Sequence, residues 1–139
     1  MADERRIAIV TGGNCGMGLE TCRRLGQLGY RVILTARDPQ AGREAVATLR
    51  AEDLDVEPFR LDLTRAEDIA ALVMHARRWL GRVDVLVNNA GLYLESAGST
   101  ISDRVSVFDA RTEVVRAILE TNLLGHFALS QGLIAQMRD

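Results

Sequence analysis

Lysine is absent from this sequence of 139 residues, and all 17 of its basic residues are arginines. These residues alone therefore cannot carry out any mechanism that needs a lysine ammonium group. Aromatic residues make up only 4% of the sequence, and there are two cysteines. Cys15 and Cys22 are too few for a disulfide framework, so we expect reduced thiols and a cytoplasmic location.

Long apolar runs and a surplus of positive charge are also missing. No run approaches the roughly 18 residues that a membrane helix needs, and the charged N-terminus has no signal-peptide core, so we expect no membrane partner. The net charge of −2 gives no electrostatic footprint for nucleic acid. His75 and His126 have no cysteine or carboxylate at metal-ligand spacing, so no metal site is predicted. The length of 139 residues predicts one domain over residues 1–139, and a hydrophobic share of 47% is ordinary for a globular protein.

Apolar runs alternate with segments of helical period. The runs predict strands at 6–11, 31–36, 56–61 and 83–87. The helical spacing predicts helices at 17–28, 38–51, 65–80 and 111–137, with Asp38 capping the second and Thr64 the third. This alternation is typical of βαβ units. It predicts an α/β fold, a three-layer Rossmann-like doubly wound parallel sheet, truncated at about four strands in the order 3-2-1-4.

A glycine-rich turn, TGGNCGMG at residues 11–18, joins the first strand to the first helix. Glycines there permit positive φ and let the backbone approach a pyrophosphate closely. The helix N-terminus adds unpaired N–H groups that favour an anion. Glycines are also typical of an ordinary tight turn, but the position between a strand and an amphipathic helix favours dinucleotide binding.

Four motifs in this order resemble those of the short-chain dehydrogenase/reductase family. The turn has the spacing Gly-x-x-x-Gly-x-Gly, LDLT follows the third strand, NNAG follows the fourth, and TNLLGHF lies on the last helix. The segments TGGNCGMG, LTARD and LDLT are most similar to the carbonyl-reductase-like branch. The resemblance covers residues 6–137 and implies hydride transfer between a nicotinamide cofactor and a small carbonyl or alcohol.

The resemblance implies that the turn after the first strand holds the cofactor's pyrophosphate. The residues concerned are Thr11, Gly12, Asn14, Cys15, Gly16, Met17 and Gly18. In this comparison Thr11 buttresses the turn against the NNAG segment. Met17 and Cys15 are included by position, because they lie within the turn.

The other matching residues have implied roles along the rest of the cofactor. Asp62 would accept a hydrogen bond from the adenine amino group, with Leu63 lining the ring. The nicotinamide-side ribose would be bordered by Asn89, Ala90 and Gly91. Taken alone, Asp62 and Asn89 are also explained as turn residues after strands.

The end of the second strand bears on the choice between NADP and NAD. An acidic residue there usually binds an unphosphorylated ribose, but Ala36 takes that position and Arg37 follows it. A guanidinium can pair with a 2′-phosphate, so we predict NADP(H) over NAD(H). Many NADP-binding relatives have a basic residue where this chain has Cys15. The competing interpretation is that Arg37 is a solvated loop residue.

The catalytic motif of the family has only one counterpart here, Asn122, which matches the catalytic asparagine. The family's acid/base is a tyrosine in a Tyr-x-x-x-Lys motif. Four residues after Tyr30 and Tyr93 stand Leu34 and Ala97. We therefore expect an N-terminal part of an oxidoreductase that is inactive alone, or else a non-enzymatic dinucleotide-binding or interaction module.

A half-sheet of this kind is expected to leave apolar surface uncovered. The fourth strand would have an exposed edge that a next strand normally pairs. The last predicted helix has an apolar stripe that a following βα unit would bury, so we expect aggregation, dimerisation through this surface or a partner chain. Gly125 and Gly132, seven residues apart on that helix, are a second hint of a homo-oligomer, because they permit a close helix–helix or subunit approach.

Overall fold

A computed structural model describes residues 5–93 and 110–137 of the chain. Strands and helices alternate as the sequence predicts. In chain order the elements are β1 (Ile7–Val10), α1 (Gly16–Gln27), β2 (Arg31–Ala36), α2 (Pro39–Arg50), β3 (Val56–Arg60), α3 (Ala66–His75), β4 (Val85–Val87), α4 (Thr112–Leu119) and α5 (His126–Leu133).

The four strands form one parallel sheet in the order β3-β2-β1-β4, which confirms the predicted topology. Ile9 of β1 lies opposite Ile33 of β2 and Leu86 of β4. Strand β3 has β2 as its neighbour, with Pro58 opposite Leu34. Proline cannot donate a ladder hydrogen bond, so its presence in β3 fits this edge position.

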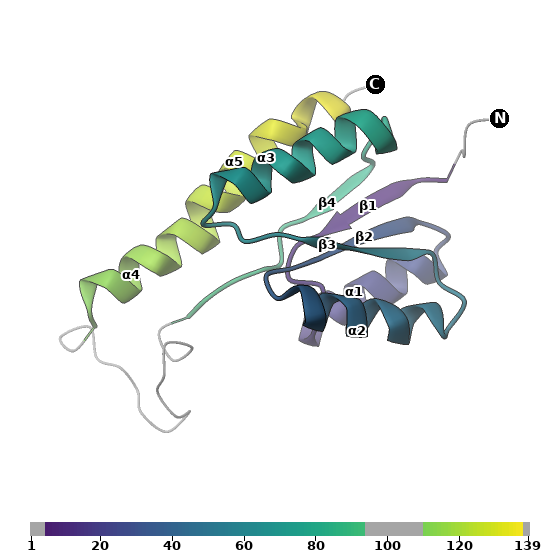
Figure 1. The fold of residues 1–139 in the computed structure, drawn as a ribbon, viewed down its shortest axis with the longest axis horizontal. Helices are drawn as coiled ribbons and strands as arrows, with labels where there is room; N and C mark the ends of the chain where they lie inside the picture. Colours follow the sequence, from purple (N-terminus) through teal and green to yellow (C-terminus); the bar gives the residue numbers. More distant parts are fainter. Residues whose placement is uncertain (1–4, 94–109, 138–139) are drawn as a thin grey trace.

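Both faces of the sheet are covered by helices, and most residues of the central strands β1 and β2 are apolar. Figure 1 shows α3 and α5 on one face and α1 and α2 on the other. Ile9 and Ile33 pack toward α3 and α5, whereas Val10 and Leu34 pack toward α1 and α2. Alternation of side chains along each strand divides the core into these two layers.

Several helix ends lie where local chemistry puts them. The Asp38 side chain accepts a hydrogen bond from Gln40 N at 2.9 Å and caps α2 as predicted. Thr64, by contrast, does not cap α3. The N-cap residue is Arg65, and the Thr64 hydroxyl donates instead to Asp62 Oδ1 at 2.7 Å. The Thr64 hydroxyl is thus used in the turn at Asp62, so it does not bind an amide of the helix.

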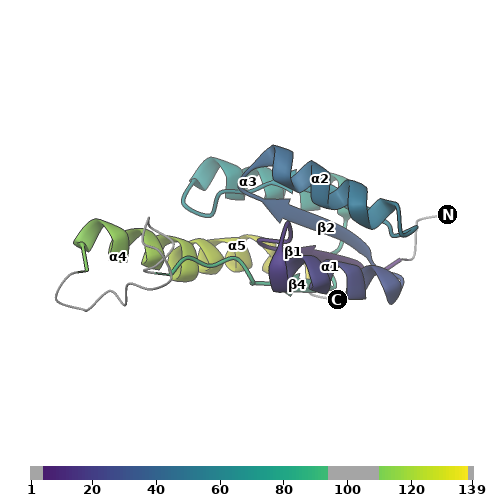
Figure 2. The same cartoon turned by 90° about the horizontal axis from the view of Figure 1, so that it is seen from below.

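The last predicted helix is a continuous helical run from Thr112 to Gln136, but its hydrogen-bond register changes three times. A π-helical segment, Glu120–Gly125, separates α4 from α5, and a short 3-10 turn follows. Figure 2 shows α4 and α5 following one another, with α4 farther from the sheet than α5. No helix within residues 5–93 and 110–137 is long and apolar enough to cross a membrane.

The glycines of the last helical run serve packing within the chain. A Cβ on Gly125 would lie 2.4 Å from Leu63 O, and one on Gly132 would lie 2.6 Å from Val73 Cγ2. Both glycines therefore let this run approach α3 and the chain before it. They are used inside the molecule and so give no support to an oligomer.

Candidate functional site

A cleft of about 420 Å³ opens at the carboxyl ends of the strands, where open α/β sheets bind ligands. It is lined by Gly12, Asn14, Cys15, Met17, Gly18, Arg37, Leu61, Asp62, Leu63, Asn89, Ala90, Gly91, Leu92 and Thr121. The structure thus brings most of the predicted site residues to one place. Of the others, Thr11 is buried beside the cleft, while Gly16 and Asn122 adjoin lining residues.

The first wall of the cleft is the turn after β1, and glycine makes its shape possible. Gly12 has φ +63°, and a Cβ on it would lie 2.9 Å from Ala90 Cα. A Cβ on Gly18 would lie 2.1 Å from Gly12 O and 2.5 Å from Asn89 Nδ2. Gly16 also has positive φ, but nothing lies within 4 Å of its Cβ position. Glycine is therefore required at 12 and 18 because other atoms of the protein approach these positions closely. At position 16 only the positive φ favours glycine.

The Thr11 hydroxyl ties this turn to the chain after β4. Its Oγ1 accepts hydrogen bonds from Asn89 N at 2.9 Å and Ala90 N at 3.0 Å, and donates to Val87 O. The side-chain Nδ2 of Asn89 in turn donates hydrogen bonds to the carbonyls of Thr11 and Gly12, both at 3.1 Å. The two walls of the cleft are therefore joined by a reciprocal hydrogen-bond network, the buttress that the family resemblance implies for Thr11.

Asp62 lies on the floor of the cleft at the end of β3. Its Oδ1 accepts hydrogen bonds from the Thr64 amide and hydroxyl, which is the geometry of a turn residue. Partial burial raises the pKa of its carboxyl, but those bonds and the nearby charges of Arg37 and Arg60 outweigh it, so the pKa is lowered. Asp62 is thus an ionised acceptor facing the cleft.

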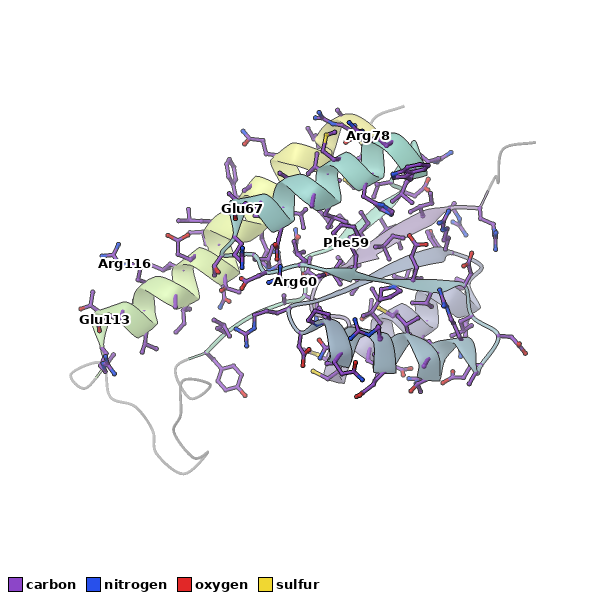
Figure 3. All side chains as sticks on the ribbon, viewed as in Figure 1. Phe59, Arg60, Glu67, Arg78, Glu113 and Arg116 are labelled. Atoms are coloured by element: carbon purple, nitrogen blue, oxygen red, sulfur yellow. The ribbon has the colours of Figure 1, made fainter. Side chains whose placement is uncertain are left out.

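Buried Asp68 in the first turn of α3 fixes the backbone at this point. Its Oδ2 accepts from Asp62 N at 2.9 Å and its Oδ1 from Arg60 Nη1 at 2.9 Å. Figure 3 shows Arg60 at the end of its strand, close to α3. Sequence reasoning missed Asp68, although an acidic residue in the first turn of a helix is a recognisable signal.

Arg37 is exposed directly after β2 and lines the cleft. Its positive charge helps to lower the pKa of the Asp62 carboxyl, and both residues line the cleft. Ala36, the residue at the position where an acidic side chain is expected for a free ribose, is buried. The exposure of Arg37 agrees with its interpretation as a solvated loop residue. Its place in the lining of the cleft agrees with its interpretation as a residue that binds the 2′-phosphate.

Asn122 lies in the π-helical segment and forms hydrogen bonds with the backbone of the chain after β4. Its Oδ1 accepts from Leu92 N and its Nδ2 donates to Leu92 O, both at 2.7 Å. A single amide side chain therefore satisfies both polar groups of one residue. Register changes of the π type are frequent at functional sites. Leu61, Leu92 and Thr121 line the cleft but were not predicted, although each adjoins a predicted motif residue.

No group of three metal-ligating side chains occurs within the part of the chain that the structure describes. The two histidines have separate partners. His75 Nε2 lies 3.2 Å from Glu57 Oε1 on the edge strand, whereas His126 lies beside the cleft against Asn88 and Ala90. Cys15 is exposed and Cys22 is buried, and both are free thiols. Burial raises the pKa of Cys22 to about 12.

Comparison with known proteins agrees with this geometry. The sequence profile of the short chain dehydrogenase family matches residues 6–139. A (+)-neomenthol dehydrogenase of Arabidopsis thaliana is 43% identical over 97 residues, which are 66% of this chain and 33% of that protein. Carbonyl reductase [NADPH] 1 of Pongo abelii is 39% identical over 126 residues, 90% of this chain and 42% of that protein.

Solved structures show the same fold. A metagenomic short-chain oxidoreductase in complex with NADP has a TM-score of 0.83 and 31% identity, over 95% of this chain and 56% of that one. An F189W actinorhodin polyketide ketoreductase with NADPH also has a TM-score of 0.83, with 32% identity over 99% of this chain and 49% of that one. The chain therefore spans about half the length of these structures, and less of the two sequence relatives.

Proposed function

The chain belongs to the short-chain dehydrogenase family, and from that premise we propose that residues 1–139 are the cofactor-binding part of an NADP(H)-dependent oxidoreductase. The observation that carries the proposal is the cleft itself, lined by the glycine turn after β1 and by the chain after β4. A Cβ at Gly18 would collide with Gly12 O, so the turn is folded tightly on itself, as a dinucleotide-binding turn is.

The lining residues fit a dinucleotide along the whole cleft. The amides of the turn and the N-terminus of α1 suit a pyrophosphate, because they present partial positive charge. Asp62, ionised and aimed at the cleft, suits an amino group of adenine. Asn89, Ala90 and Gly91 suit the nicotinamide-side ribose. When bound, the nicotinamide supplies or accepts the hydride, and these residues orient it.

Arg37 carries the proposed preference for NADP(H). A guanidinium that lines the cleft beside an alanine favours a 2′-phosphate over a free 2′-hydroxyl. The relatives described as NADP complexes support this preference. A charge-assisted contact of this kind is worth roughly 2 kcal/mol, which is about a thirtyfold difference in affinity.

The test is a titration of the chain with NADPH and with NADH, followed by fluorescence or calorimetry. We expect tighter binding of NADPH, and Arg37→Ala should abolish most of the difference while leaving NADH binding unchanged. Arg78→Ala is the matched control, since Arg78 lies in the π-helical segment Ala76–Leu80 that follows α3 (Figure 3) and does not line the cleft. Equal affinities that Arg37→Ala does not alter would remove the NADP assignment.

We expect no appreciable turnover from residues 1–139 themselves. The chain has an asparagine at the expected catalytic position, Asn122, but no lysine and no Tyr-x-x-x-Lys motif. Loss of a positioned acid/base and its electrostatic support removes several orders of magnitude in rate. The activity of an intact enzyme on a small carbonyl or alcohol would need those groups from further residues.

A non-enzymatic dinucleotide-binding module is the alternative. Sequencing of the gene beyond codon 139 separates the two. A downstream serine followed by Tyr-x-x-x-Lys supports the oxidoreductase, whereas a stop codon with no such coding sequence supports the module.

Self-association is a further part of the proposal. Leu119, Leu123, Leu124 and Phe127 lie on the last helical run and are at least half exposed. Apolar side chains gathered on one element favour burial against another surface. We expect a concentration-dependent increase in sedimentation coefficient, and a monomer at all concentrations would contradict this. We also propose a cytoplasmic location, in line with the two free thiols.

A further inference from the structure

Three polar side chains on the last helical run bind the chain after β4 at regular intervals. Asn122 binds both backbone groups of Leu92 at 2.7 Å. Four residues on, His126 Nε2 lies 2.7 Å from Ala90 O and its Nδ1 lies 3.1 Å from Asn88 Oδ1. Four residues further, Ser130 Oγ accepts from Asn88 Nδ2 at 3.2 Å. We call these contacts the helix ladder.

The helix ladder runs along one side of the segment after β4. Its side chains stand at positions 122, 126 and 130, and they meet residues 92, 90 and 88 in turn. The helical run and this segment are therefore antiparallel. The helix supplies hydrogen-bond partners along the side of this segment, in the way that a neighbouring strand would.

His126 holds the middle of the ladder and acts on a residue that lines the cleft. Both backbone polar groups of Ala90 have a side-chain partner. Ala90 N donates a hydrogen bond to Thr11 Oγ1 at 3.0 Å, and Ala90 O lies 2.7 Å from His126 Nε2. His126 itself is only 8% exposed. Ala90 also lies against Gly12, so its position sets the separation of the two cleft walls.

We propose that His126 is a positioning residue of the cofactor cleft, which sets the orientation of the Ala90–Gly91 peptide by donating an Nε2–H hydrogen bond to Ala90 O. The inference rests on the proposed dinucleotide function and deepens it. Nε2 is the donor because a carbonyl oxygen can only accept. The other ring nitrogen, Nδ1, lies 3.1 Å from the side-chain amide of Asn88.

Paired substitutions separate the hydrogen bond from simple packing. The amide nitrogen of glutamine can occupy the place of Nε2, whereas that of asparagine reaches only the place of Nδ1. We expect His126→Phe and His126→Asn to weaken NADPH binding about tenfold, and His126→Gln to recover most of the affinity. His75→Phe and His75→Gln are the matched controls, since His75 contacts Glu57 outside the cleft, and they should leave NADPH affinity unchanged.

A second measurement on the wild-type chain needs neither a variant nor a ligand. Nitrogen-15 spectra of the imidazole should show a proton on Nε2 of His126 that exchanges slowly with water. In the variants, exchange of the Ala90 and Leu92 amides should quicken in the same order as the loss of affinity. Gln no better than Asn, or an unprotonated Nε2, would overturn the proposal. A wild-type chain that binds no dinucleotide but shows the protected Nε2 proton would overturn the function and keep the ladder.

Discussion

The two walls of the cleft are built by opposite means. The wall after β1 owes its shape to side chains that are missing, since a Cβ at Gly12 or Gly18 would collide with backbone. The wall after β4 owes its shape to side chains that are present, because Asn122 and His126 bind its backbone directly. The first wall therefore has no room for a Cβ at positions 12 and 18, and the second wall depends on the hydrogen-bonding groups of Asn122 and His126. Substitutions should show this difference.

The largest effect is expected for Gly18→Ala in the glycine wall. The new Cβ would lie 2.1 Å from Gly12 O, a contact that only movement of the backbone can relieve. We expect a loss of roughly 3 kcal/mol in the free energy of unfolding, with loss of dinucleotide binding. Urea denaturation and an NADPH titration measure the two effects.

Gly16→Ala is the control for that change. Gly16 belongs to the same turn and has φ +55°, but its Cβ position is open. The cost should be the backbone strain alone, about 1 kcal/mol. If the two variants are equally stable, close approach is not what the glycine at position 18 provides.

A smaller effect is expected for Thr11→Val, which tests the junction of the two walls. Valine keeps the shape of threonine but leaves the Asn89 and Ala90 amides without their acceptor. Unpaired buried donors cost about 2 kcal/mol here. Thr11→Ser keeps the hydroxyl and should be milder, as measured by urea denaturation and by faster exchange of the Ala90 amide. A serine variant less stable than the valine variant would show that the methyl group matters more.

The smallest effect concerns Asp62 and pH. The folded-state pKa of Asp62 is lowered below its ordinary value of 3.8, so its ionised form stabilises the fold above that pH. This contribution is lost as the pH falls below 3.8 toward the folded-state pKa. Asp62→Asn should flatten the acid side of the pH dependence of unfolding by less than about 1 kcal/mol. Parallel curves for the two proteins would contradict the lowered pKa.

Much of the fold and of the first wall could be predicted from local patterns. Alternating apolar runs fixed four strands and their order, and Asp38 before Pro39 marked the start of α2. The glycine turn could also be predicted, because the spacing of glycines after a strand is a local signal. Arg37 and Asp62 were each predicted as cofactor-binding residues after a strand, and both line the cleft.

Other features had no local signal strong enough to choose between partners. Thr64 could cap α3 or bind Asp62, and only the path of the chain at the end of β3 decided for Asp62. His126 in an apolar helix gave no sign of its contact with Ala90, which lies 36 residues earlier in the chain. The exchange of α-helical for π-helical register at residues 120–125 likewise depends on tertiary contacts.

The amino-acid sequence by itself determined the alternation of strands and helices, the glycine wall and the family, because each depends on residues close together in the chain. Only the tertiary structure decided which side chains join the two walls and hold the second one in place. Those contacts depend on the sheet bringing residues 11, 90 and 126 together, and a hydrogen bond exists only where its donor and acceptor meet within about 3 Å.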